Sequence, residues 1–361
     1  MVSLSGKTWL KYITKSLGMG NKMDHIHGDT VSHLWGNRSR LAPLLLVLLL
    51  LSGCSTKLPS AEMAQTLYLP PTTADEQDRF VPFFEVFGTA SQHNRIGTPA
   101  VRLGTDGDQV FIDTSQATVF VQRRLFSTNK GVYTNLIYRI HFSKIPRSFW
   151  PFYLGAGEHV GLFVIVTLNN AEQPLLYTTV HTCGCYLAFI PTSYLWPEAF
   201  PDSWSRQAQK VYGETLPGLL DLHHATVEGD YRVGLKIRND THRVMDLRLA
   251  SSQQIATRRH TEMILKPHTL LENLSSQSAS APVSFFETTG VRAGYVKNSE
   301  KIWERLLMSW WTLDWRIGED KRLGQNTADG PIFYTSIKPW QRTNSDLRNF
   351  PRFLNYWGWK L

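Results

Sequence analysis

Residues 231–249 read YRVGLKIRNDTHRVMDLRL, and this stretch decides the fold class. Apolar side chains alternate with polar ones from Tyr231 to Ile237, and again from Val244 to Leu249. Alternation with a period of two places the apolar residues on one face of a strand. The polar segment 238–242 between the two runs is typical of a turn. The stretch therefore predicts an antiparallel hairpin with one face buried.

The same pattern extends toward the N-terminus. Runs 118–126 and 132–142 flank the turn-forming segment 127–131, which predicts a second hairpin. Residues 160–166 are almost continuously apolar and β-branched, so we expect a strand buried on both faces. A further turn at 169–174 leads into an apolar run, which we interpret as one strand over 175–190.

Helices are expected at two places. Asp202 is a suitable N-cap and Gly213 a suitable C-terminal residue for a short helix between them. A longer helix is predicted over 300–313, and its apolar stripe consists of Ile302, Trp303, Leu306, Leu307 and Trp310. Together the patterns predict a mainly β fold, with antiparallel hairpins in a sandwich-like domain and C-terminal amphipathic helices. A helical and aromatic region is expected from about residue 298.

Composition narrows the function classes. The chain has 361 residues, 42% hydrophobic and 12% aromatic, which is enough for a sizeable core. The net charge of +8 is spread along the chain without a dense basic patch, so we expect no nucleic-acid partner. No G-x-S-x-G or H-E-x-x-H motif occurs in the sequence.

The N-terminal segment carries the clearest signal. The apolar run 41–51 follows Arg38 and Arg40 and ends at Leu51-Ser52-Gly53-Cys54. This run has 11 residues, whereas a membrane-spanning helix needs about 20, so it fits the apolar region of a signal peptide. An uncleaved membrane anchor with a chance cysteine is the alternative interpretation.

The motif at residues 51–54 resembles the lipobox of bacterial lipoproteins. The resemblance implies that residues 1–53 form a signal peptide and that Cys54 carries acyl chains, so the membrane is a partner. Ser55 resembles the residue that follows the cysteine in outer-membrane lipoproteins, which implies an outer-membrane location facing the periplasm. About 40 residues before the apolar run exceed what a signal peptide needs, so Met23 is an alternative start.

Domain boundaries follow from this signal. Residues 54–78 are rich in Pro, Ser and Thr and lack periodicity, so we interpret them as a lipidated tether. Residues 79–361 are then the β-rich globular domain. A chain starting near Gln77 is expected to fold without the tether.

One cluster suggests chemistry. In an extended strand, His181, Cys183 and Cys185 would share a face, and imidazole with two thiolates is a suitable ligand set for zinc or copper. His159 on the preceding strand is the nearest fourth ligand, although a regular register puts it on the opposite face unless a bulge intervenes. His223 and His224 are alternative donors.

Two other interpretations of the cysteines stay open. Gly184 could allow a strained, redox-active disulfide between Cys183 and Cys185. The thiols could instead pack as small buried apolar groups, which is the interpretation we prefer.

These patterns lead to two functional hypotheses. The first is a non-catalytic, lipid-anchored envelope lipoprotein with a binding or structural role and an envelope protein as partner. The second is a periplasmic metal-binding or thiol-redox protein centred on His181, Cys183 and Cys185. Seven of the twelve tryptophans lie between residues 303 and 359. We expect most of these rings to cover the β core, with contact to a membrane or partner as the alternative.

Overall fold

The computed structural model describes residues 64–71, 78–105, 107–223, 231–275 and 282–361. The predicted signal peptide and Cys54 lie outside these ranges. The strands are β1 (Gln65–Leu69), β2 (Phe83–Phe87), β3 (Thr98–Gly104), β4 (Gly107–Asp113), β5 (Thr118–Ser127), β6 (Val132–His141), β7 (Lys144–Ile145), β8 (Gly157–Glu158), β9 (Gly161–Leu168), β10 (Pro174–His181), β11 (Ala188–Pro191), β12 (Ala208–Val211), β13 (Glu214–Pro217), β14 (Tyr231–Ile237), β15 (Val244–Ser251), β16 (Thr261–Glu262) and β17 (Ile264–Pro267). The α-helices are α4 (Ser252–Ala256), α5 (Ile302–Thr312) and α6 (Phe350–Tyr356).

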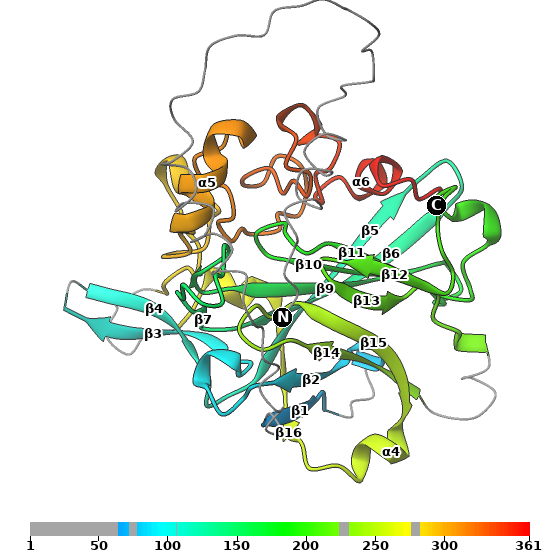
Figure 1. Ribbon diagram of the computed structural model, residues 1–361, viewed down its shortest axis with the longest axis horizontal. Coiled ribbons are helices and arrows are strands. Elements are labelled where there is room, and N and C mark those ends of the chain that lie inside the picture. Colours follow the sequence, from blue (N-terminus) through cyan, green and yellow to red (C-terminus); the bar gives the residue numbers. More distant parts are fainter. Residues whose placement is uncertain (1–63, 72–77, 106, 224–230, 276–281) are drawn as a thin grey trace, which may run out of the picture. The chain divides into compact units, whose positions relative to one another are not determined.

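Two sheets form the framework of the domain (Figure 1). One has five strands in the order β15-β14-β2-β1-β16, and the other has six in the order β11-β10-β9-β6-β5-β17. Most neighbouring strands are antiparallel hairpin partners, but β2 with β14, β1 with β16 and β5 with β17 pair in parallel. The fold is therefore mainly β and sandwich-like, as the sequence predicts.

The strongest local predictions are confirmed. Strands β14 and β15 form the predicted hairpin, with a register shift after Lys236. Strands β5 and β6 form the hairpin around residues 127–131. Every residue of β9 is buried, which confirms a strand covered on both faces.

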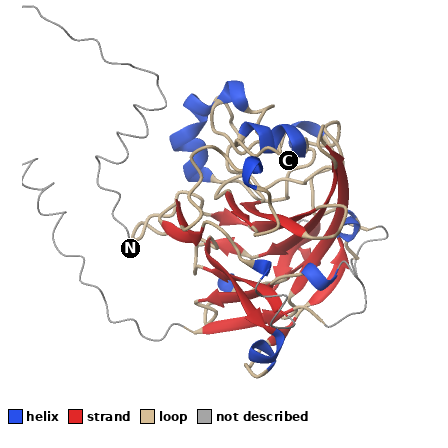
Figure 2. Ribbon diagram, turned by 90° about the vertical axis from the view of Figure 1, so that its right-hand side faces the viewer, coloured by secondary structure: helices blue, strands red, loops and turns tan. Residues whose placement is uncertain are grey.

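The six-stranded sheet is covered on its two faces by different partners. On one face, Tyr138, Val164 and Tyr177 pack against Phe84 and Leu235 of the five-stranded sheet. The alternate residues of its strands face a second core, built with side chains of the C-terminal segment: Phe333, Leu347, Phe350, Phe353, Leu354 and Trp359. Figure 2 shows α5 and α6 on the same side of the strands.

The tether prediction is wrong for residues 65–69. These residues form β1, which lies between β2 and β16 in the five-stranded sheet. Leu67 and Tyr68 are each only 4% exposed. Apolar residues in a short run between prolines carry little periodicity, so the sequence pattern did not reveal a strand there. The globular domain therefore begins before residue 79.

The helix predicted over 202–213 is also wrong. Residues 208–217 form the hairpin β12–β13, with Tyr212 and Gly213 at its tip. Both tip residues have positive φ, 51° and 87°. That conformation is typical of two-residue hairpin turns and incompatible with a helix that continues through them. Gly213 therefore serves a turn and not a helix end.

Helix α5 confirms the predicted element but reverses the expected orientation of its faces. Leu306, Leu307 and Trp310 of the apolar stripe are exposed, and Trp310 is 75% exposed. The buried side chains of the helix are Glu304 and Thr312. Within the described residues, no helix is long and apolar enough to cross a membrane.

Candidate functional site

The cysteine segment turns and is not part of a strand. Strand β10 ends at His181, whose N–H donates to Cys185 O at 2.9 Å, while the Gly184 N–H donates to His181 O at 2.8 Å. Gly184 has φ of 94°, and a Cβ at this position would lie 2.3 Å from Tyr334 O. The prediction of one continuous strand over 175–190 is therefore wrong, and so is the shared face it implied.

The predicted zinc or copper ligands are not assembled. His181 Nε2 lies 3.0 Å from His242 O, and His159 Nδ1 lies 2.6 Å from Lys297 O. Because a carbonyl accepts, each of these nitrogens is a donor and is not free to bind a metal. Across the described ranges, no group of three or more His, Cys, Asp or Glu side chains is placed to hold a metal ion. His223 bonds to Ser193 O, and His224 lies outside the described residues.

Cys183 and Cys185 have the contacts of packed thiols. Cys183 is buried, Cys185 is partly exposed, and neither forms a disulfide. The Cys185 N–H donates to Cys183 Sγ at 3.4 Å. The hydrogen bond between the two thiols, together with burial, raises the pKa of Cys185 well above its usual range. A raised pKa leaves little thiolate, which is the reactive form, so these contacts favour packing over redox chemistry.

The buried polar centre of the domain lies beside this turn and was not identified from the sequence. Lys301 Nζ is 2.9 Å from Asp320 Oδ2, and the two side chains are 2% and 0% exposed. Asp320 Oδ1 accepts hydrogen bonds from Thr182 Oγ1 and, at 3.4 Å, from the Gly161 N–H. Burial opposes the charged form of Lys301, but Asp320, Cys183 and Glu304 together outweigh burial and raise the pKa of Lys301.

Glu304 is the third member of the buried centre, three residues after Lys301. Burial raises the pKa of Glu304 to about 7, although Lys301 and Lys321 oppose the shift. The carboxyl lies against Gly318 and Gly155, where a Cβ would come within 2.1 Å and 3.2 Å of its oxygens. Among the described residues it forms no ion pair within 4.0 Å, so its charge is stabilised only at longer range.

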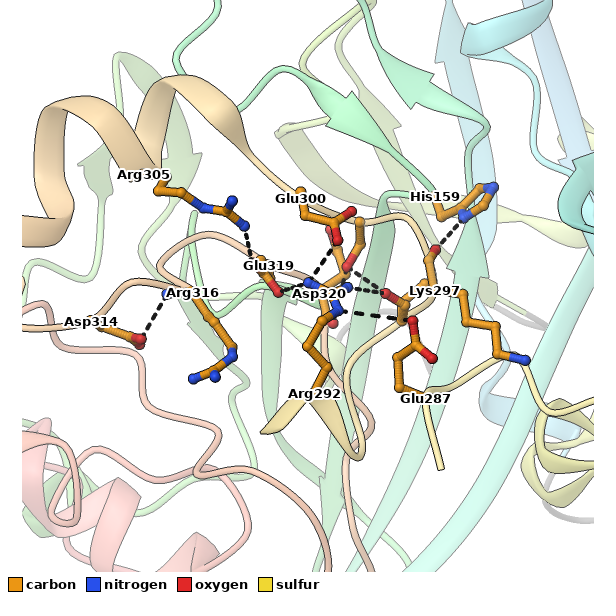
Figure 3. Close-up of polar contacts among 12 residues, drawn as sticks. His159, Glu287, Arg292, Lys297, Glu300, Arg305, Asp314, Arg316, Glu319 and Asp320 are labelled. Atoms are coloured by element: carbon orange, nitrogen blue, oxygen red, sulfur yellow. Dashed lines mark hydrogen bonds and ion pairs between the residues drawn. The ribbon is translucent and has the colours of Figure 1, made fainter. Parts of the chain in front are cut away.

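A second ionic cluster connects α5 to the segment before Asp320 (Figure 3). Glu319 is 1% exposed and lies between two arginines, 2.5 Å from Arg292 and 2.8 Å from Arg305. Arg292 also contacts Glu300 at 2.9 Å. Because the carboxylate is buried and both arginines are largely covered, this cluster fixes the polar face of α5 to the domain.

One cavity among the described residues lies apart from these groups. It has a volume of about 180 Å³ and is bordered by His268, Glu272 and Arg322. An ion pair at 2.8 Å between Glu272 and Arg322 occupies the charged groups of that border. Neither the cysteine turn nor the Lys301 centre contributes to it.

The outward face of α5 is the main exposed feature. Phe149 and Phe152 contact the Trp303 ring at centroid distances of 6.0 and 5.7 Å, which joins the 149–152 loop to the helix. Side chains three and four residues apart continue this face along α5. We call the combined set the aromatic surface; it comprises Phe149, Trp150, Phe152, Trp303, Leu306, Leu307, Trp310, Trp311, Leu313 and Trp315.

The aromatic surface corrects the expectation for the C-terminal tryptophans. Trp359 is buried in the second core, as expected, but Trp310, Trp315 and Trp340 are between 65% and 75% exposed. Exposed contiguous apolar side chains are typical of contact sites for membranes or proteins. A scan against protein-family models, a search of curated proteins and a search of solved structures each found no match.

Proposed function

We propose that this protein is a lipid-anchored, non-catalytic lipoprotein of the cell envelope, located at the outer membrane and facing the periplasm. Its aromatic surface binds the membrane–water interface as a second contact beside the acyl chains on Cys54. The observation that carries the proposal is the outward-facing apolar stripe of α5, continued by Phe149 and Trp150 at 82% and 83% exposure. Tryptophan and other large apolar side chains favour this interface.

Two features support a membrane as the partner of the aromatic surface: nearby cations and the short segment between Cys54 and β1. Lys144 and Arg147 are exposed immediately before Phe149, so cations adjoin the apolar side chains. This combination suits anionic headgroups above an apolar layer. Cys54 precedes Gln65 by eleven residues, a segment that spans at most about 40 Å when extended. A lipid-anchored domain would therefore stay close to the bilayer.

Vesicle binding by the unacylated chain tests this proposal. Residues 55–361 should float with vesicles that contain phosphatidylglycerol. Trp310→Ser and Phe149→Ser should each weaken binding several-fold, because each removes a large apolar group from the interface. Leu103→Ser is the matched control, since Leu103 is 72% exposed on β3, outside the aromatic surface. Absence of binding, or equal binding by the three variants, would contradict the proposal.

The metal or thiol-redox alternative gains no specific support. Its premise was three side chains on one strand face, whereas the backbone turns at Gly184. The decisive measurement is the metal content of the purified protein beside that of His181→Ala. Stoichiometric zinc or copper that disappears in the variant would restore this alternative.

A further inference from the structure

The centre formed by Lys301, Asp320 and Glu304 places an amine and a carboxyl in close contact away from water. Lys301 Nζ is 2.9 Å from Asp320 Oδ2, and both side chains are essentially inaccessible. A buried ion pair gives up the hydration of two charges, and its attraction often fails to offset that cost. Conversion of the pair to a neutral amide would remove that cost.

The two carboxylate oxygens of Asp320 differ in their hydrogen bonds. Oδ1 accepts from the Thr182 hydroxyl and from the Gly161 N–H at 3.4 Å. Oδ2 faces Lys301 but has no partner in hydrogen-bonding geometry, although Nζ is only 2.9 Å away. Donors directed at one oxygen stabilise negative charge that develops there when a nucleophile adds to the carboxyl carbon. The other oxygen is free to leave.

Glu304 is a second carboxyl beside the Lys301–Asp320 pair. The Gly155–Gly157 segment covers both Lys301 and Glu304, because a Cβ at Gly157 would lie 2.7 Å from Lys301 Cδ and one at Gly155 3.2 Å from Glu304 Oε1. The absence of side chains at these glycines lets the two groups lie beneath one strand of backbone. Burial raises the pKa of Glu304 to about 7, so its carboxyl is partly protonated at neutral pH and competes less than Asp320 for Lys301.

We propose that Lys301 and Asp320 react to form an intramolecular isopeptide bond. The Lys301 ammonium, 2.9 Å from Asp320 Oδ2, transfers a proton to that oxygen. The neutral amine then attacks Asp320 Cγ, forming the N–C bond while Oδ1 takes up negative charge beside Thr182 and Gly161. The Cγ–Oδ2 bond breaks, and Oδ2 leaves as water with two protons that originated on Lys301. An ammonium and a carboxylate thus become an amide and one water molecule.

The fold favours this reaction through position and exclusion of water. Holding the two groups in contact makes the bond formation effectively unimolecular. Burial of both residues also keeps water away from the amide afterward. The bond would join the residue before α5 to the Glu319–Asp320 segment, and so add a covalent link where Arg292 and Arg305 already hold Glu319. It is independent of the proposed membrane role.

Intact mass of the denatured protein tests the proposal. The chain should be lighter than its sequence by the mass of one water molecule. Tryptic digestion should yield a branched peptide that contains uncleaved Lys301 and Asp320. A mass equal to the sequence mass, with ordinary peptides around both residues, would show a plain ion pair and overturn the proposal. A branched peptide through Lys321 in place of Lys301 would overturn the assignment.

Variants separate the roles of the three residues. Asp320→Ala should abolish the mass deficit. Glu304→Gln keeps Lys301 and Asp320 in place and removes the other nearby carboxyl, so it should fold and show the full deficit. A missing deficit in Glu304→Gln would overturn Asp320 as the partner of Lys301. Lys236→Arg is the matched control, because Lys236 pairs with Asp246 at 3.6 Å on the surface and should leave the deficit unchanged.

Discussion

Leu67→Ala should destabilise the domain, although Leu67 lies in a segment whose composition indicates a tether. Its side chain is 4% exposed and packs against Phe83 and Ile255. Truncation of a buried leucine to alanine costs about 2–5 kcal/mol, through lost burial and the cavity left behind. We expect about 3 kcal/mol, because this small cluster lies at one face of the sheet and can relax in part. Gln65→Ala changes an exposed residue of the same strand and should cost less than about 0.5 kcal/mol.

Urea unfolding followed by circular dichroism measures both substitutions. With a slope of about 3 kcal/mol per molar urea, the midpoint of Leu67→Ala should fall by about 1 M at an unchanged slope. A chain starting at Thr72 removes β1 from between β2 and β16, and should lose cooperative unfolding. Equal midpoints for the two substitutions, with normal unfolding of the shortened chain, would refute the inclusion of β1 in the core.

Three further predictions concern the interior. Gly184→Ala should destabilise by about 2 kcal/mol or more in thermal melts, because the residue has positive φ and a Cβ would meet Tyr334 O; an unchanged melting temperature would contradict the turn. Glu319→Gln should cost about 3 kcal/mol in the same assay, since it leaves two largely covered arginines without their carboxylate; a shift no larger than that of a surface substitution would count against it. Burial lowers the pKa of His181 to about 4 and that of His268 to about 3, below the unfolded value of about 6.5. The unfolded chain therefore binds more protons in acid, so stability that is present above pH 6.5 is lost as the pH falls. His181 alone should account for a loss of about 3 kcal/mol at pH 4. A urea midpoint that stays flat between pH 7 and 5 would contradict this prediction.

Sequence periodicity predicted the positions of strands and helices better than it predicted what packs against them. The β14–β15 hairpin alternates strictly, and β9 is uniformly apolar, so each pattern had one structural solution. Helix α5 was also predicted, but an apolar stripe does not reveal whether protein, membrane or solvent lies opposite. On α5, Glu304 is buried and Arg305 pairs with Glu319, whereas a hydrophobicity pattern assigns both charged residues to the surface.

The candidate sites were harder to predict because they depend on turns and on distant partners. The spacing of His181, Cys183 and Cys185 fits one face of a strand. The structure has a turn there instead, with Gly184 at positive φ. Lys301 and Asp320 lie in different segments and match no short motif. One available signal was the glycine pair Gly155 and Gly157, which marks a close approach of backbone to other atoms.

The parallel pairings of β1 with β16 and of β5 with β17 determine when folding can be completed. Tyr68 is opposite Thr261, and Thr118 is opposite Ile264, so both sheets receive a strand from residues 261–267. Such distant pairings raise the contact order, and closing long loops slows folding. If the chain is exported N-terminus first, β1 emerges early and can pair with β2, but its other edge stays unpaired until β16 arrives. An edge left unpaired during that interval can pair with other chains.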